Sequence, residues 1–372
     1  MKILLVGAGG YGEYYLKHLL KNTDPEIIFE GIVEKFRCPM EEEVLAAGIP
    51  IYENLEQFYE KHTADLAVIA TPAFLHKEQS VFCAEHGSFV LCEKPTAPTV
   101  AEAEEMIRAQ EKTGKFIAIG FQAAFADETL ELKKDILSGK LGKPLAMKTL
   151  FCTSRDLAYY ARGGGYAGRI QKDGRMILDS VASNACAHYL HNMLFLLGDT
   201  LDTSAFAQNL TGECYRANNI ENFDTCTLKA TTEGGVSVYF AATHANLKDT
   251  PYTFVADFEK AQVRWTRDKD EMMTAYFKDG TTKVYGNPYA LGIAKKLSDC
   301  VEAVRDNTVP VCTVKTTLPH LVLIGDIYKN IPIKNFPEEE KVLLEDPRRI
   351  AVPGLEEKMM LAFERTCLLS EL

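Results

Sequence analysis

The chain contains no long hydrophobic run, no internal repeat and no low-complexity segment. No apolar stretch approaches the ~20 residues that a membrane-spanning helix requires. The first apolar run begins directly after Met1, which leaves no room for a signal peptide. We therefore expect a cytoplasmic protein that has no membrane among its partners.

Closely spaced cysteine pairs and an excess of basic residues are also missing. The ten cysteines include no CxxC pair, and Cys83, Cys92 and Cys226 lie in apolar stretches. This pattern indicates buried free thiols in a reducing compartment rather than a disulfide framework or a zinc site. The 52 acidic side chains outnumber the 41 basic ones, for a net charge of -11, so nucleic acid is not expected as a partner.

The first third of the sequence alternates short apolar runs with amphipathic helical segments. Residues 64–70 and 88–92 have the length and composition of buried strands. Thr99 and Glu102 form a capping box, which opens a helix after the second of these strands. Strands separated by helices predict an α/β fold with a doubly wound parallel sheet. We expect this Rossmann domain to span residues 1–121.

A glycine-rich motif follows the first strand. The apolar run Lys2–Val6 leads into Gly7-Ala8-Gly9-Gly10-Tyr11-Gly12, and apolar side chains then recur at helical spacing. At such a strand-to-helix turn, the helix N-terminus can bind the pyrophosphate of a dinucleotide. We expect Gly7 to allow the tight turn, Gly9 the approach of a phosphate and Gly12 the packing of helix on strand. The cofactor-binding residues predicted here are Gly7, Gly9, Gly10, Tyr11 and Gly12.

An acidic residue stands at the end of the second apolar stretch, 27–33. Glu34 follows Gly12 at close to the ~20-residue spacing of dinucleotide-binding folds. Its carboxylate can accept hydrogen bonds from both ribose hydroxyls, which favours NAD. Lys35 and Arg37 keep NADP open, because a nearby cation accommodates a 2′-phosphate. The alternative is a glycine-rich turn with a capping acid and no ligand.

The sequence changes character after residue 121. An apolar helix is predicted over 185–197, and segments that resemble the strands of an antiparallel sheet follow it. We expect a second, α+β domain over 122–335. The charged tail, 336–372, carries apolar side chains at intervals and is expected to dock on the body of the protein.

Three more motifs carry a resemblance to a known family. The most specific is Glu93-Lys94-Pro95, and the others are Thr71-Pro72 with His76 and the segment Gly120-Phe121-Gln122. Together with the glycine motif, they resemble the glucose–fructose oxidoreductase / inositol dehydrogenase / MocA (Gfo/Idh/MocA) family. The resemblance covers nearly the whole chain, and its motifs occur in the order expected for that family. The resemblance implies a large, mostly antiparallel sheet in the second domain. It also implies further cofactor contacts from Thr71, Pro72, His76, Glu93, Lys94 and Gln122.

The catalytic segment of that family has the pattern LLDxxxHxxDxxxxLLG, which this chain matches with altered spacing. Counted back from Leu196-Leu197-Gly198, the histidine of the pattern falls on His188, and His191 takes the place of the following Asp. More residues than usual separate Asp179 from His188, so Asn184 is an alternative to Asp179 near the substrate.

These residues suit hydride transfer from a carbinol, which needs a base for the hydroxyl proton and a cation beside the developing alkoxide. Lys94 can supply the cation, and His188 can serve as the base, because histidine as a residue type titrates near neutrality. On a helix, Asn184, His188 and His191 would share one face. We expect Lys94, His188 and Asp179 to be catalytic, and Asn184 and His191 to lie near the substrate.

Each of these residues also has a structural interpretation. Lys94 could be a surface lysine before a proline turn, and His188 and His191 could be core histidines. No metal is expected, because a site built on His188-x-x-His191 needs a third strong ligand at a defined spacing, and Asp179 does not stand at such a spacing.

The segment 159–175 is rich in hydrogen-bond donors and precedes the catalytic pattern. Such donors suit a polyhydroxylated or carboxylated substrate. The residues expected to contact it are Tyr160, Arg162 and Lys172. The alternative is a basic loop that faces solvent.

Three functions remain open from the sequence. The first is an NAD(P)-dependent oxidoreductase that transfers a hydride between nicotinamide and a hydroxyl or carbonyl of a sugar, cyclitol or related polyol, the substrate class coming from the resemblance. The second is an NAD-dependent glycoside hydrolase without net redox change. The third is a non-catalytic regulator that binds a dinucleotide or sugar. In each case we expect a homodimer or homotetramer formed through the C-terminal sheet.

Overall fold

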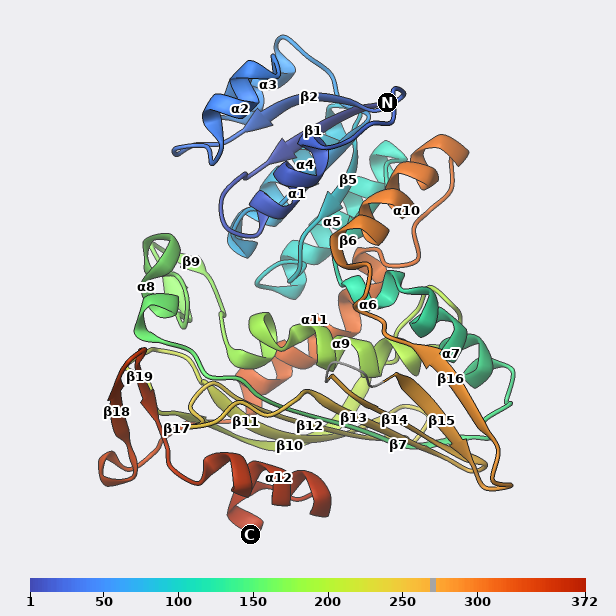
Figure 1. Ribbon diagram of the computed structural model, residues 1–372, viewed down its shortest axis with the longest axis vertical. Coiled ribbons are helices and arrows are strands. Elements are labelled where there is room, and N and C mark those ends of the chain that lie inside the picture. The colour runs from blue at the N-terminus through green and yellow to red at the C-terminus, as the bar shows by residue number, and fades with distance from the viewer. Residues whose placement is uncertain (268–271) are drawn as a thin grey trace. The chain divides into compact units, whose positions relative to one another are not determined.

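The computed structural model describes residues 1–267 and 272–372 (Figure 1). The chain forms two compact units, each built from two segments of the sequence. Unit 1 comprises Met1–Phe125 and Tyr289–Leu318, and unit 2 comprises Ala126–Pro288 and Pro319–Leu372. Within the part of the chain that the structure describes, no helix combines the length and apolar character needed to cross a bilayer.

Unit 1 is built on a six-stranded parallel sheet with the order β3-β2-β1-β4-β5-β6. The central strand, β1, pairs with β2 on one side and β4 on the other, so the strand order reverses there. This is the strand order of dinucleotide-binding folds, and it confirms the predicted doubly wound sheet. The strands are β1 (Lys2–Val6), β2 (Ile28–Val33), β3 (Ile51–Tyr52), β4 (Leu66–Ile69), β5 (Phe89–Cys92) and β6 (Ile117–Ile119).

Helices connect the strands of unit 1 and cover the sheet. Helix α5 begins at the predicted capping box, in which Thr99 and Glu102 each bond the backbone of the other. The helices are α1 (Gly12–Leu20), α2 (Glu41–Ala46), α3 (Leu55–Tyr59), α4 (His76–Glu85), α5 (Val100–Thr113), α6 (Gln122–Phe125) and α10 (Gly292–Asp306).

The return of residues 289–318 to unit 1 differs from the expected boundaries, which placed this segment in 122–335. Helix α10 contacts α1, α6 and β5, and buries Leu297 and Cys300. The backbone N–H of Ile119 donates to the carbonyl oxygen of Cys312 at 2.9 Å. An amphipathic stripe shows that a helix is buried on one face, but it does not show which core receives that face.

Unit 2 is built on a nine-stranded sheet with the order β16-β15-β14-β13-β7-β12-β11-β10-β17. Among the strand pairs that the structure describes in this sheet, only β7–β12 and β10–β17 are parallel, which confirms the large, mostly antiparallel sheet. Its strands are β7 (Pro144–Cys152), β10 (Ala207–Arg216), β11 (Thr225–Thr232), β12 (Ser237–Thr243), β13 (Thr253–Phe258), β14 (Ala261–Thr266), β15 (Met273–Phe277), β16 (Thr282–Gly286) and β17 (Ile333–Asn335).

Helices α9 and α12 contact this sheet, and Figure 1 shows them on opposite faces. The tail helix α12 buries Leu355, Met359 and Phe363 in one cluster with Leu150 and Tyr239 of the sheet. The tail therefore covers part of the sheet face that the sequence analysis had left for a second subunit. The remaining elements are α7 (Asp127–Leu137), α8 (Leu157–Gly165), β8 (Gln171–Lys172), β9 (Arg175–Met176), α9 (Ala187–Leu196), α11 (Val314–Asn330), β18 (Val342–Glu345), β19 (Arg348–Ala351) and α12 (Leu355–Arg365).

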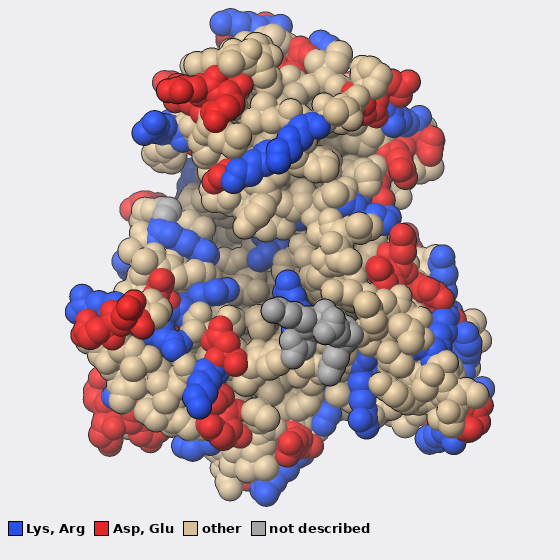
Figure 2. Space-filling view, viewed as in Figure 1, with Lys and Arg blue, Asp and Glu red and all other residues tan. Residues whose placement is uncertain are grey.

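The surface carries both signs of charge. On the face shown in Figure 2, Lys and Arg side chains are interspersed with Asp and Glu side chains.

A buried histidine makes the stability of unit 2 depend on pH. The Nδ1 of His244 lies 2.7 Å from the Thr153 carbonyl oxygen. Burial, and then the Arg155 guanidinium, lower the pKa of His244 from 6.5 to about 3. The unfolded chain takes up a proton at this residue below the unperturbed pKa, whereas the folded chain stays neutral. The full contribution of His244 to the free energy of unfolding is therefore present above pH 6.5. As the pH falls from 6.5 toward about 3, about 1.4 kcal/mol of this free energy is lost per pH unit.

We expect the variant His244→Asn to have a flatter acid limb of stability against pH than the wild type. Its amide Nδ2 can replace the donor to Thr153 but takes up no proton. Urea denaturation of both proteins at intervals between neutral and acidic pH measures this. Identical acid limbs in the two proteins would contradict the assignment.

Candidate active site

The glycine motif forms the turn between β1 and α1, and two of its glycines are sterically required. Gly7 has φ +83°, and a Cβ there would lie 2.8 Å from Thr71 Cγ2. A Cβ on Gly12 would lie 2.0 Å from the carbonyl oxygen of Gly7. Any side chain at position 12 would therefore force α1 away from β1.

Glu34 follows β2, and its carboxylate faces this turn. Glu34 Oε2 accepts hydrogen bonds from the backbone N–H groups of Ala8, at 2.8 Å, and Gly9, at 3.2 Å. The helix N-terminus beside them has no side-chain cap, since Tyr11 makes no capping hydrogen bond. The turn thus places a helix N-terminus, which suits a pyrophosphate, beside a carboxylate, which suits a ribose. These features fit a bound dinucleotide.

Glu93 lies in the interior of unit 1, with 5% of its surface exposed. Its Oε1 accepts from the Tyr15 hydroxyl at 2.7 Å and from the ammonium group of Lys296. Its Oε2 accepts from the backbone N–H of Lys94 at 3.2 Å. Glu93 therefore holds the backbone at Lys94 in place. The sequence had predicted only a cofactor contact for Glu93.

Lys296 is a functional candidate that the sequence analysis missed. It belongs to α10, is fully buried, and its Nζ lies 5.1 Å from the ring centre of Tyr11 and 5.4 Å from that of Tyr15. The available signal was a lysine on the apolar face of an amphipathic helix, one turn before Cys300. A lysine buried in this way requires a partner of opposite charge.

His76 links the two loops that follow β4 and β5. Its Nε2 lies 2.8 Å from the Thr71 carbonyl oxygen, and its Nδ1 lies 2.8 Å from the Pro95 carbonyl oxygen. Burial lowers the pKa of His76, and the two carbonyl groups oppose this shift. A neutral ring can donate to one of the two oxygens, so the loops that carry Thr71-Pro72 and Lys94-Pro95 are tied through this side chain.

Lys94 and Gln122 complete the candidate residues of unit 1. Lys94 is partly buried and precedes a cis peptide bond to Pro95. Gln122 opens α6, and its Oε1 accepts from the Tyr11 hydroxyl at 3.3 Å. Gln122 therefore joins the glycine motif at Tyr11.

In unit 2, Asp179 and Asn184 form one hydrogen-bonded group. Asp179 is 7% exposed, and its Oδ2 accepts from the backbone N–H of Gly168 at 2.7 Å. Its Oδ1 accepts from the side-chain amide of Asn184. Burial, and then the charge of Asp179, raise the pKa of Tyr159 to about 12. The two residues that the sequence treated as alternatives are thus direct partners.

The altered spacing between Asp179 and His188 is taken up by a π-helical turn, Val181–Ala185. The backbone N–H of Cys186 donates to the carbonyl oxygen of Val181 at 2.8 Å, across the wider π-helical ring. The expectation that Asn184, His188 and His191 share one helix face is therefore wrong, because α9 begins only at Ala187. Single π turns inside helices frequently occur at functional sites.

The two histidines of α9 differ in their surroundings. His188 is partly buried. His191 is 1% exposed, stacks on Phe195 with ring centres 5.9 Å apart and meets the edge of His320 at 6.1 Å. These contacts give His191 a packing role, as one of the two interpretations from the sequence proposed.

The donor-rich segment is partly helical, not the loop that its composition suggested. Helix α8 is capped by Asp156, whose Oδ1 accepts from the Tyr159 backbone N–H at 2.7 Å. The Arg162 guanidinium lies 3.7 Å from the centre of the Tyr159 ring, and the Lys172 ammonium donates to the Gly164 carbonyl oxygen. Arg162 and Lys172 thus support the local fold, while Tyr160 lines a cavity of unit 2. Among the described residues, no group of three or more His, Cys, Asp or Glu side chains is arranged to hold a metal ion.

Comparison with known proteins shows a family likeness in the first part of the chain. Residues 1–121 match the GFO_IDH_MocA model, which is described as an oxidoreductase family with an NAD-binding Rossmann fold. This part of the chain is therefore similar to the Gfo/Idh/MocA family. The match covers the motifs of unit 1 from the glycine turn to Phe121.

Individual relatives resemble mainly this first part of the chain. Inositol 2-dehydrogenase of Mycolicibacterium smegmatis is 31% identical over 163 residues, or 42% of this chain and 45% of that protein. An NADP-dependent scyllo-inositol 2-dehydrogenase of Bacillus subtilis is 35% identical over 101 residues, or 27% of this chain and 30% of its own. The chain therefore matches less than half the length of these curated relatives.

A solved structure extends the likeness to both units at the level of the fold. The WlbA dehydrogenase of Chromobacterium violaceum, crystallised with NADH and UDP-GlcNAcA, superposes with a TM-score of 0.73 at 21% identity. The superposition covers 88% of this chain and 93% of that one. The likeness in fold to this dehydrogenase thus extends over both units.

Proposed function

We propose that this protein is an NAD(P)-dependent oxidoreductase that transfers a hydride between nicotinamide and a hydroxyl or carbonyl group of a cyclitol, sugar or related polyol. The observation that carries the proposal is the placement of Glu34, whose carboxylate is bonded to the amides of the glycine turn at the end of β2. The inositol dehydrogenases among the relatives support the substrate class.

The residues of unit 1 have distinct roles in this proposal. The amides of the glycine turn would bind the pyrophosphate, and Glu34 would accept hydrogen bonds from the ribose hydroxyls. Thr71, Pro72 and Gln122 would line the cofactor, with His76 fixing the loops around it. The bound nicotinamide supplies the hydride acceptor or donor. Because a carboxylate repels a 2′-phosphate, we expect NADH to bind more tightly than NADPH.

The acid–base roles fall to Lys94 and the residues around His188. In the direction of oxidation, His188 would accept the hydroxyl proton of the substrate, and the Lys94 ammonium would stabilise the developing alkoxide. Asp179 would orient Asn184, which would donate to a substrate hydroxyl. We propose His191 as a support of His188, and Tyr160, Arg162 and Lys172 as substrate-side residues of α8 and β8.

We further propose a cytoplasmic homodimer or homotetramer. Ten free cysteines, nine of them buried, suit a reducing compartment. Helix α12 contacts β7 and β12 at the centre of the sheet. The part of the same sheet face that α12 leaves uncovered is the surface proposed for the second subunit. We also propose that the chain divides functionally at residues 121 and 335, the boundaries expected from the sequence.

The proposal is tested by titrating the full chain with NADH and NADPH, and then by following absorbance at 340 nm with a panel of inositols, sugars and polyols. We expect tighter binding of NADH, and we expect Glu34→Gln to bring the two dissociation constants closer together. Glu30→Gln, which changes the neighbouring acid of β2, is the matched control.

Two other outcomes would overturn the proposal. Binding without turnover on any polyol would favour the NAD-dependent glycoside hydrolase or the regulator. Failure to bind either nucleotide would remove the dinucleotide site itself.

A further inference from the structure

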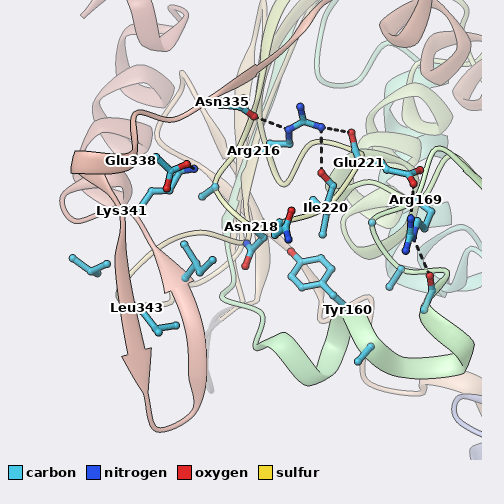
Figure 3. Close-up of a pocket in the computed structure, with 18 residues that line it drawn as sticks. Tyr160, Arg169, Arg216, Asn218, Ile220, Glu221, Asn335, Glu338, Lys341 and Leu343 are labelled. Atoms are coloured by element: carbon cyan, nitrogen blue, oxygen red, sulfur yellow. Dashed lines mark hydrogen bonds and ion pairs between the residues drawn. The ribbon is translucent and has the colours of Figure 1, made fainter.

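Unit 2 contains a cavity of about 1080 Å³ whose lining does not include Lys94, Asp179 or His188 but does include Tyr160, proposed above as a substrate-side residue. Its walls come from α8, from the segment 216–221 after β10 and from the hairpin of β18 and β19 (Figure 3). The whole cavity belongs to one compact unit. It is large enough for a small-molecule ligand.

Two buried polar atoms of the cavity wall lack a hydrogen-bond partner among the described residues. They are the hydroxyl of Tyr160 and the Oδ1 of Asn218, and Figure 3 shows the Tyr160 ring pointing toward Asn218. Asn218 is 3% exposed, and its Nδ2 donates to Asp224 Oδ2 at 2.8 Å, which fixes the amide with its oxygen unused. Buried polar atoms are satisfied in nearly all folded proteins, so this pair indicates a missing partner. A ligand hydroxyl can donate to the Asn218 oxygen and bond the Tyr160 hydroxyl.

The charges around the cavity add a preference for an anion. Arg169 pairs with Glu221 at 2.5 Å, and Lys341 pairs with Glu338 at 2.7 Å. Arg216 donates only to neutral oxygens in the contacts described: Asn335 Oδ1 at 2.6 Å and the carbonyl oxygens of Ile220, at 3.2 Å, and Glu221, at 2.7 Å. The lining therefore has one cation more than its anions. A guanidinium in this setting is suited to a carboxylate.

We propose that this cavity is a binding site for a small polyhydroxylated carboxylate, of the sugar-acid class. The carboxylate would bind Arg216, and ligand hydroxyls would bond Asn218 and Tyr160. Lys94, Asp179 and His188 are not part of its lining, and its occupancy does not require a nucleotide.

The wall of the cavity also supports Asp179. Gly168 lines the cavity and donates its backbone N–H to Asp179 Oδ2 at 2.7 Å, while the Asp179 backbone N–H donates to the Arg169 carbonyl oxygen at 2.9 Å. A ligand in the cavity would therefore contact the segment that holds this carboxylate.

The test is calorimetric titration of the full chain with D-glucuronate, D-galactonate and uncharged D-glucose, without nucleotide. We expect a sugar acid to bind more tightly than glucose. Tyr160→Phe removes a hydroxyl that bonds no described residue, so the fold should be retained, and the affinity should fall about tenfold. Arg216→Gln should also weaken the acid about tenfold and reduce its advantage over glucose.

The matched control is Arg348→Gln, which removes the same charge from β19 at an exposed side chain outside the cavity lining. It should bind as the wild type does. Absence of binding by both acids would overturn the proposal. So would binding that Lys94→Ala abolishes and that Tyr160→Phe and Arg216→Gln leave unchanged, since the acid would then occupy the hydride-transfer residues instead.

Discussion

Replacing Lys94 by alanine should lower kcat/KM by about 10²–10⁴-fold while leaving the dissociation constant of NADH nearly unchanged. The loss follows from removing the cation proposed to stabilise the alkoxide, an interaction made chiefly in the transition state. The backbone N–H of Lys94, which bonds Glu93, is retained in this variant. Steady-state kinetics with the best polyol of the panel and a fluorescence titration with NADH measure the two quantities.

Two further variants define the role of Lys94. Lys94→Arg keeps the positive charge, so it should recover part of the rate that Lys94→Ala loses. Lys112→Ala, an exposed lysine of α5 that pairs with Glu85, should behave as the wild type. Full activity of Lys94→Ala would remove Lys94 from the catalytic residues.

Replacing Lys296 by methionine should destabilise unit 1 by about 3–5 kcal/mol, because the Glu93 carboxylate would stay buried without its counterion. The double variant Lys296→Met with Glu93→Gln should recover much of this loss, since no charge is then left in the interior. The neighbouring variant Lys295→Met breaks a more exposed pair with Asp299, and should cost about 0–1 kcal/mol.

The position of the single tryptophan makes this measurement specific. Trp265 lies in β14 of unit 2 and is 3% exposed, so its fluorescence reports on unit 2, whereas far-ultraviolet circular dichroism reports on both units. Lys296→Met should therefore lower the denaturation midpoint of the dichroism component that comes from unit 1. The midpoint of the Trp265 fluorescence, which comes from unit 2, should fall less. Equal stability of Lys296→Met and the wild type would show that Glu93 finds another partner.

The sequence determined the fold of unit 1 because the relevant signals are local. Strand length, helical spacing and the capping box at Thr99 depend on neighbouring residues. The need for glycine at positions 7 and 12 depends on a turn that the motif itself defines. The carboxylate of Glu34 reaches that turn because β1 and β2 are adjacent in the Rossmann order. The resemblance then predicted the large sheet of unit 2.

The tertiary structure decided what depends on contacts between distant segments. Lys296 finds Glu93 across about two hundred positions of sequence, and no periodicity encodes that pairing. The π turn between Asp179 and α9 contains Asn184, which was expected on one helix face with His188 and His191. Its side-chain amide instead donates directly to Asp179. Tyr160 and Asn218 come from segments that only the folded sheet brings to one cavity. Local patterns specify which surfaces must be buried, but the packing of the whole chain selects the partners that bury them.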